Sequence, residues 1–95
     1  HGAEDDDIAP LAYREIAETI RNGRIKETHR LVIKLYGPVE LEYLELDAAS
    51  TCEHVERITG ESISEANVHK IWARFKADFK AELERAEGDA GGDRP

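Results

Sequence analysis

The sequence predicts an all-α fold, a small bundle of about four to five helices in one domain that covers residues 8–86. Apolar residues recur at spacings of three and four along most of the chain, which is the period of a helix with one buried face. Ser, Thr and Asp precede several of these runs and Gly follows them, as at helix ends. With 95 residues, 40% hydrophobic and 36% charged, the chain can bury one small core under a well-solvated surface.

The first helix is expected over residues 8–25. Residues 1–7 carry four acids and no large apolar side chain, so we expect a disordered acidic leader before it. Asp6 or Asp7 is the expected N-cap, Pro10 fits the first turn, and Gly23 after Asn22 is expected to end the helix in the left-handed conformation. The predicted apolar face consists of Ile8, Leu11, Ala12, Ile16 and Ile20.

Residues 27–47 fit two interpretations. In the first, Thr28 caps a short helix that ends at Gly37, and Pro38 begins another. Its face would be Leu31, Val32, Leu35 and Tyr36. In the second, residues 31–47 form a β-hairpin, because apolar and acidic residues alternate after a Gly-Pro turn. We favour the helices, and the hairpin remains the alternative.

A short helix is expected from Ser50 to Thr59. Ser50 or Thr51 is the predicted N-cap, and Ser50 with Glu53 matches a capping box. The inner side is expected to hold Cys52, Val55, Ile58 and Thr59. Gly60 then ends the helix.

The longest helix is expected over residues 62–86, followed by a flexible tail at 87–95. Ser64 is the preferred N-cap over Ser62, because only that start lets Ile63 pack onto Val68 as a hydrophobic staple. The rings of this helix are expected in the core. Its apolar stripe consists of Val68, Ile71, Trp72, Phe75, Phe79 and Leu83.

A short capped helix, a turn with glycine and a long amphipathic helix follow one another, which is the order of a helix-turn-helix. Away from the apolar stripe, the long helix carries polar and basic side chains, at Asn67, His69, Lys70, Arg74, Lys76 and Lys80. The net charge of −8 disfavours contact with a polyanion, but residues 31–61 hold two basic and seven acidic side chains, whereas residues 62–80 hold four basic and two acidic ones. The distribution therefore supports a DNA-reading helix.

A family resemblance follows from two stretches. The segment ISEANVHKIWARFKADFKAEL resembles the end of the C-terminal promoter-binding domain of bacterial sigma factors of the extracytoplasmic-function type, in which I-S-x-x-x-V opens the recognition helix. The segment REIAETIRNGRIKETHRLVIKLYG resembles the two leading helices of that domain, which end in an L-Y pair. The likeness covers about residues 11–86, with an acidic insertion, PVELEYLELDAAS, between its parts.

The resemblance implies a DNA-binding domain of a transcription initiation factor or regulator, which binds double-stranded DNA and works with the RNA polymerase core. The residues expected to enter or flank the major groove are Ser64, Glu65, Ala66, Asn67, His69, Lys70, Arg74, Lys76 and Lys80. Among them Asn67, Lys70 and Arg74 would read base edges, while His69, Lys76 and Lys80 would meet phosphates. The alternative is a protein interaction module whose acidic segment 39–56 binds a basic partner.

Other functions lack support in the sequence. No nucleophile motif, phosphate-binding glycine loop or paired-ligand metal pattern is present, so we expect neither an enzyme nor a cofactor. The single Cys52 cannot form an internal disulfide, and no long apolar segment occurs, so a cytoplasmic protein without membrane contact is expected. The chain has no Met and begins with His1 and Gly2, which is typical of a domain cut from a longer protein.

Overall fold

The computed structural model describes residues 10–91, and this part of the chain is entirely helical. Its elements are α2 (Leu11–Asn22), α3 (Glu27–Tyr36), the 3-10 turn η1 (Val39–Leu41), α4 (Ala48–Thr59) and α5 (Glu65–Gly91). The all-α prediction is confirmed. The expected leader 1–7, with its caps Asp6 and Asp7 and the apolar Ile8, lies outside the described residues.

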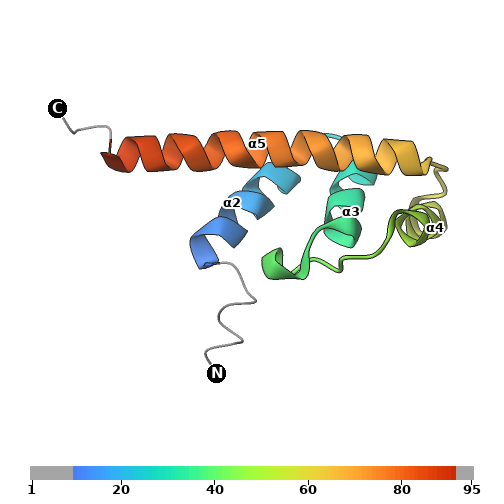
Figure 1. Cartoon of the computed structure of the whole chain (residues 1–95). Helices are drawn as coiled ribbons and strands as arrows, with labels where there is room; N and C mark the ends of the chain where they lie inside the picture. The colour runs from blue at the N-terminus through green and yellow to red at the C-terminus, as the bar shows by residue number, and fades with distance from the viewer. Residues whose placement is uncertain (1–9, 92–95) are drawn as a thin grey trace, which may run out of the picture.

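Helix α5 forms one layer, and the three shorter helices pack beneath it (Figure 1). It has 27 residues, which at a rise of 1.5 Å per residue span about 40 Å. The other helices meet α5 in chain order, with α4 near its start, α3 next and α2 farther along. The α4 helix crosses α5 after the five-residue connection 60–64, so the expected order of a helix-turn-helix is present.

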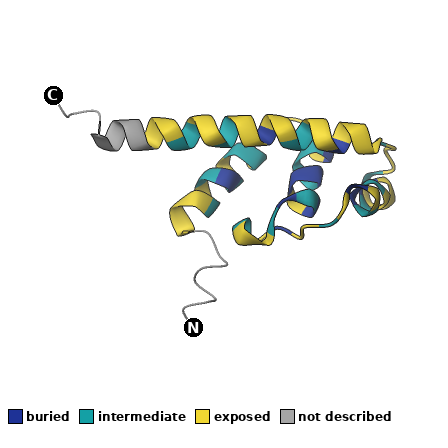
Figure 2. Ribbon diagram, in the orientation of Figure 1, coloured by how far each residue is buried: buried dark blue, intermediate teal, exposed yellow. Residues whose placement is uncertain are grey.

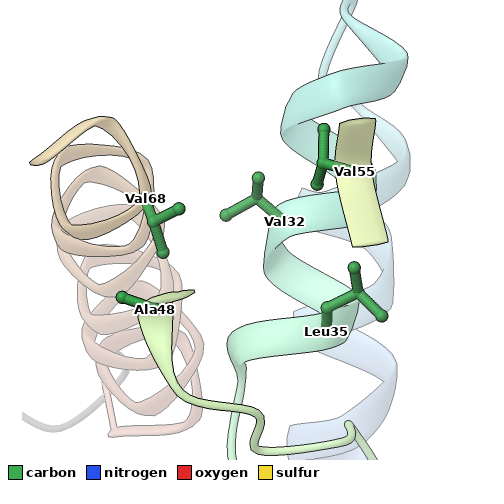
Figure 3. Close-up of a cluster of buried hydrophobic side chains, with 5 residues drawn as sticks. All are labelled: Val32, Leu35, Ala48, Val55 and Val68. Atoms are coloured by element: carbon green, nitrogen blue, oxygen red, sulfur yellow. The ribbon is translucent and has the colours of Figure 1, made fainter. Parts of the chain in front are cut away.

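Two clusters of buried side chains hold these layers together. One joins α3, α4 and α5 and consists of Val32, Leu35, Ala48, Val55 and Val68 (Figure 3). The other joins α2, α3, α5 and the chain after η1, and consists of Ala17, Ile33, Tyr43 and Phe75. Since Val32 and Ile33 are neighbours on α3 and enter different clusters, α3 is the central support of the domain.

Helix α2 differs from its prediction at both ends. It begins at Leu11 with Pro10 as the N-cap, and it ends at Asn22 with Gly23 as the C-cap, at the position where the sequence predicts its closure. Gly23 has φ −78° and ψ −8°, so the predicted left-handed cap is wrong. Its N–H instead reaches the carbonyls of Thr19 and Ile20 in a right-handed last turn.

The segment 31–47 shows why the hairpin alternative is wrong. After α3 the chain makes η1 and returns in extended form beside the end of α3, where the N–H groups of Leu44 and Leu46 donate to the carbonyls of Lys34 and Leu35 at 3.0 and 2.8 Å. Carbonyls at a helix end need such donors, so this extended segment caps α3 and does not pair with a β-strand. No strand occurs within residues 10–91.

The start of α3 also differs from its prediction. The helix begins at Glu27 with Lys26 as the N-cap, so Thr28 is not the cap. Thr28 is buried inside the first turn, and its hydroxyl donates to Glu61 Oε1 at 2.8 Å. The Thr28 hydroxyl, which the sequence predicts as a local cap, therefore bonds to Glu61, 33 residues away.

The start of α4 is set by Asp47, so the predicted caps Ser50 and Thr51 are wrong. Asp47 Oδ1 accepts the N–H of Ser50 at 2.7 Å. Thr51 is fully buried in the helix and donates its hydroxyl to the Asp47 carbonyl. Ile58, predicted on the inner side, is 58% exposed, while Gly60 ends the helix at φ 79° as expected.

Helix α5 confirms the predicted start and apolar stripe. Ser64 Oγ accepts the N–H of Asn67 at 3.1 Å, which identifies Ser64 as the N-cap. Val68 and Phe75 are buried, and Phe75 stacks between Trp72 and Phe79. The helix continues to Gly91, five residues beyond its predicted end at residue 86. Residues 92–95 lie outside the described part.

Candidate nucleic-acid interface

The side of α5 that faces away from the other helices is exposed along its described length (Figure 2). All nine residues predicted to contact DNA are exposed there or at the helix start. They are Ser64, Glu65, Ala66, Asn67, His69, Lys70, Arg74, Lys76 and Lys80. Small side chains, Ala66, Ala73 and Ala77, lie opposite the buried Val68 at about 100° per residue.

The polar members of this set do not form one cluster. Asn67, Lys70 and Arg74 project from one flank of α5 at about 100° per residue. By the same spacing, His69, Lys76 and Lys80 project from the opposite flank. The alanines lie between the flanks, so the outward face is a narrow strip of small residues bordered on both sides by basic groups.

The first flank borders a cleft that the sequence did not predict. The cleft has a volume of about 230 Å³ and lies between α5 and the connection from α2 to α3. Its lining comes from three separate stretches, 24–29, 61–63 and 67–74. The lining residues are Arg24, Lys26, Thr28, His29, Glu61, Ile63, Asn67, Lys70, Ile71 and Arg74.

We call this cleft the basic cleft, and the charged groups around it shift the pKa of His29. The pKa of His29 lies below its usual value, first because the ring is partly buried and then because Lys26, Arg24 and Arg74 are positive. The carboxylate of Glu61 acts in the opposite direction. His29 therefore senses positive charge from both walls of the cleft.

Hydrogen bonds and an ion pair hold the connection from α2 to α3 against α5. Arg24 Nη2 lies 2.7 Å from Asp78 Oδ2, one turn along α5 from Arg74. The guanidinium of Arg30 donates to the carbonyls of Arg24 and, at 3.0 Å, Ile25. The ion pair keeps the basic connection close to α5, and the bonds from Arg30 fix it to α3.

Sequence reasoning missed Arg24, Lys26 and His29 as candidate site residues. The run RIKETHR carries the signal, since it is basic and lies between two predicted helices. Its nearness to residues 67–74 depends on tertiary packing, because the Arg24–Asp78 ion pair joins positions 54 residues apart.

The second flank is fixed by aromatic contacts near its start. The His69 ring lies 5.8 Å from that of Tyr36, in a tilted arrangement. Tyr36 in turn meets Trp72 edge-on at 6.2 Å. The exposed His69 thus contacts partly buried aromatic rings, whereas no aromatic contact involves Lys76 or Lys80 among the described residues.

Three acids of segment 39–56 have local structural roles. Glu42 pairs with Arg14 on α2 at 3.0 Å, and Glu45 Oε1 accepts the N–H of Val39 at 2.9 Å. Asp47 caps α4, and that bond with Ser50 N–H lowers the pKa of its carboxyl. These roles explain part of the acidity of the segment without an external partner.

The described residues contain neither a candidate metal site nor a helix that could span a membrane. No group of three His, Cys, Asp or Glu side chains there lies close enough to hold a metal ion. His54 Nδ1 lies 2.9 Å from the Ser50 carbonyl of its own helix, and burial raises the pKa of the Cys52 thiol. None of the described helices combines the length and apolar character that crossing a membrane requires.

Comparison with known proteins gives no relative for this chain. No protein family, curated protein or solved structure matches it.

Proposed function

We propose that this protein is a DNA-binding domain of a transcription initiation factor or regulator, in which α5 reads the major groove. The observation that carries the proposal is the outward face of α5, where exposed Ala66, Ala73 and Ala77 lie between two basic flanks. Small side chains allow the helix to approach the bases, one basic flank can then donate to base edges, and the other supplies charge for phosphates.

The diameter of α5 fits the width of the major groove. A helix with its side chains is about 10–12 Å across, and the major groove of B-DNA is about 12 Å wide. Helix α5 projects beyond the layer of shorter helices along one whole side, so the groove meets no obstacle from α2, α3 or α4 on that side (Figure 1).

The two flanks of α5 make different contacts with DNA, one with base edges and the other with phosphates. Lys70 and Arg74 are the donors for guanine, and Asn67 is suited to adenine. On the opposite flank Lys76 and Lys80, with His69, meet the phosphates of one strand. DNA binding by α5 therefore does not require the two flanks to form one continuous basic surface.

The overall charge limits the affinity of the isolated domain. A net charge of −8 repels DNA at long range, so binding by this chain alone is weak. In a promoter-binding protein the neighbouring domains and the RNA polymerase core raise the effective concentration at the site and compensate for it. Such a role is carried out in the cytoplasm of a bacterium.

The test is selection of bound duplexes from a random pool, followed by fluorescence anisotropy with the enriched sequence and a scrambled one at several salt concentrations. We expect enrichment of a short motif and an affinity that falls with salt, with a slope of about −0.9 per phosphate contacted. A pool that stays random, with no binding at low salt, would exclude DNA binding. The interaction module with acidic segment 39–56 would then be the better interpretation.

A further inference from the structure

The basic cleft between α5 and the connection from α2 to α3 shares Asn67, Lys70 and Arg74 with the proposed base-reading flank, and it adds Arg24, Lys26 and His29, which the proposed function does not use. We propose that this cleft binds the phosphoryl group of a small phosphorylated molecule. The inference does not rest on DNA binding, because it concerns a concave site beside the outward face of α5.

The arrangement of charges suits an anion. Four basic side chains, Arg24, Lys26, Lys70 and Arg74, line the cleft with one carboxylate, Glu61. Arg24 also pairs with Asp78 on α5, so Lys26, Lys70 and Arg74 supply the positive charge that is unpaired within residues 10–91. They come from two elements that face each other, so a bound anion is reached from both sides. Guanidinium and ammonium groups form charge-assisted hydrogen bonds to phosphate, and the Asn67 amide adds a polar group.

The size favours a small ligand. A volume of about 230 Å³ equals that of about eight liquid waters at about 30 Å³ each. It is below the range of about 300–1,000 Å³ that is typical of sites for drug-sized ligands. The cleft therefore suits a phosphate with a few further atoms.

The lining also has an apolar part. Ile63 and Ile71 are half-buried and line the same cleft as the four cations. Apolar surface beside a charged group suits an ester of phosphate with a short carbon chain better than it suits a bare ion. The proposed ligand class is thus a small phosphate monoester.

His29 links anion binding to pH. Burial and the positive charges of Lys26, Arg24 and Arg74 favour its neutral form, and Glu61 opposes them. A bound anion adds negative charge to the same space and favours the protonated ring, so binding takes up a proton. Affinity is therefore expected to increase as the pH falls.

The experiment is an NMR titration of the full 95-residue chain with inorganic phosphate and pyrophosphate, with chloride at matched ionic strength as the reference. We expect saturable shifts of the backbone amides at 24–29 and 67–74. Two double variants remove the same charge from the same helix. Lys70→Gln with Arg74→Gln changes the cleft, and Lys76→Gln with Lys80→Gln changes the opposite flank.

The expected result is that the cleft variant binds pyrophosphate at least about tenfold more weakly than wild type, since two charge-assisted contacts are lost. The opposite-flank variant should bind within about twofold of wild type, because Lys76 and Lys80 do not line the cleft and salt screens charges that act from outside it. Equal weakening in both variants, or shifts that chloride reproduces, would overturn the proposal. Both double variants change exposed side chains, and the amide spectrum itself reports whether they are folded.

Two further experiments follow. One distinguishes a small phosphorylated molecule from the DNA backbone as the source of the phosphoryl group, and the other tests whether His29 makes anion affinity depend on pH. A duplex that shifts the amides 24–29 at a lower phosphate concentration than pyrophosphate does would identify the DNA backbone as the ligand and overturn the small-molecule assignment. Sulfate, which keeps its charge in this range, should bind more tightly at about pH 5.5 than at about pH 7.5, and His29→Gln should remove the difference. An unchanged pH dependence in His29→Gln would overturn the role of His29.

Discussion

The phenol of Tyr43 donates a 2.7 Å hydrogen bond to Glu18 Oε2, which ties the chain after η1 to α2 across 25 residues. The same carboxylate accepts two bonds from Arg21, at 3.0 and 2.8 Å. Tyr43 is buried, and burial followed by the bond to Glu18 raises the pKa of its phenol. One polar network thus fixes the segment that the sequence left open between helix and hairpin.

The substitution Tyr43→Phe should destabilise the domain by about 1 kcal/mol, because it removes one hydrogen bond to a carboxylate that keeps its contacts with Arg21. Urea unfolding followed by circular dichroism measures the change. Tyr36→Phe is the matched control, since that hydroxyl has no hydrogen-bond partner among the described residues. Equal stability of the two variants would contradict a role for the Tyr43 hydroxyl.

Stability should fall in acid partly through Glu18. The bonds from Arg21, and then from Tyr43, hold the pKa of this carboxyl below its usual value, although partial burial opposes them. Its contribution is therefore complete above the unfolded pKa of about 4.3 and is lost as the pH falls through the lower folded value. Urea midpoints at a series of pH values should decline less steeply below about pH 4.3 in Glu18→Gln than in wild type. The exposed Glu15→Gln is the control, and identical slopes in all three proteins would rule out this linkage.

Gly37→Ala should destabilise the fold, although its φ of −65° and ψ of 165° suit any residue. A Cβ there would lie 2.3 Å from Tyr43 Cδ2 and 2.7 Å from the Ile33 carbonyl oxygen, so the buried ring must move. We expect a loss of about 1 to 3 kcal/mol in chemical unfolding.

Gly23→Ala is the matched control for this change. Its Cβ would meet only the Thr19 and Ile20 carbonyl oxygens at 3.4 Å, and its φ is negative. This variant should be neutral or more stable by up to about 1 kcal/mol, because alanine restricts the unfolded chain. A larger loss at Gly23 than at Gly37 would show that ring packing is not the reason for glycine at 37.

Phe75→Ala should cost about 3 to 5 kcal/mol, since the ring is 1% exposed and lies between Trp72 and Phe79. A domain of this size has a total stability of about 5 to 15 kcal/mol, so the thermal midpoint should drop sharply. Lys76→Ala, at the exposed next position, should unfold like wild type. An unchanged midpoint for Phe75→Ala would mean that another face of α5 is buried.

The two flanks of α5 should separate in DNA-binding experiments. Lys70→Ala or Arg74→Ala should weaken binding to the selected duplex by about 1 to 3 kcal/mol and relax the preference at one base pair. Lys80→Ala should weaken all duplexes alike and lower the salt slope by about one unit. If the folded Lys70 and Arg74 variants keep the full sequence preference, these residues do not read bases.

Local sequence information was sufficient where a helix depends on its own residues. The stripe of α5 from Val68 to Phe79, its cap at Ser64 and the stop at Gly60 were all predicted and are confirmed. Apolar periodicity, a hydroxyl at the first turn and a glycine at positive φ act within a few residues, so the sequence contains their cause.

Tertiary structure decided the features whose partners are distant in the chain. Tyr43 meets Glu18 across 25 residues, Thr28 gives its hydroxyl to Glu61 across 33, and Arg24 pairs with Asp78 across 54. Each contact gains free energy only after the helices have packed, because the entropy of closing the intervening loop must first be overcome. Packing therefore decided the conformation of segment 31–47, the partner of Thr28 and the formation of the basic cleft. Periodicity along the chain does not encode this packing.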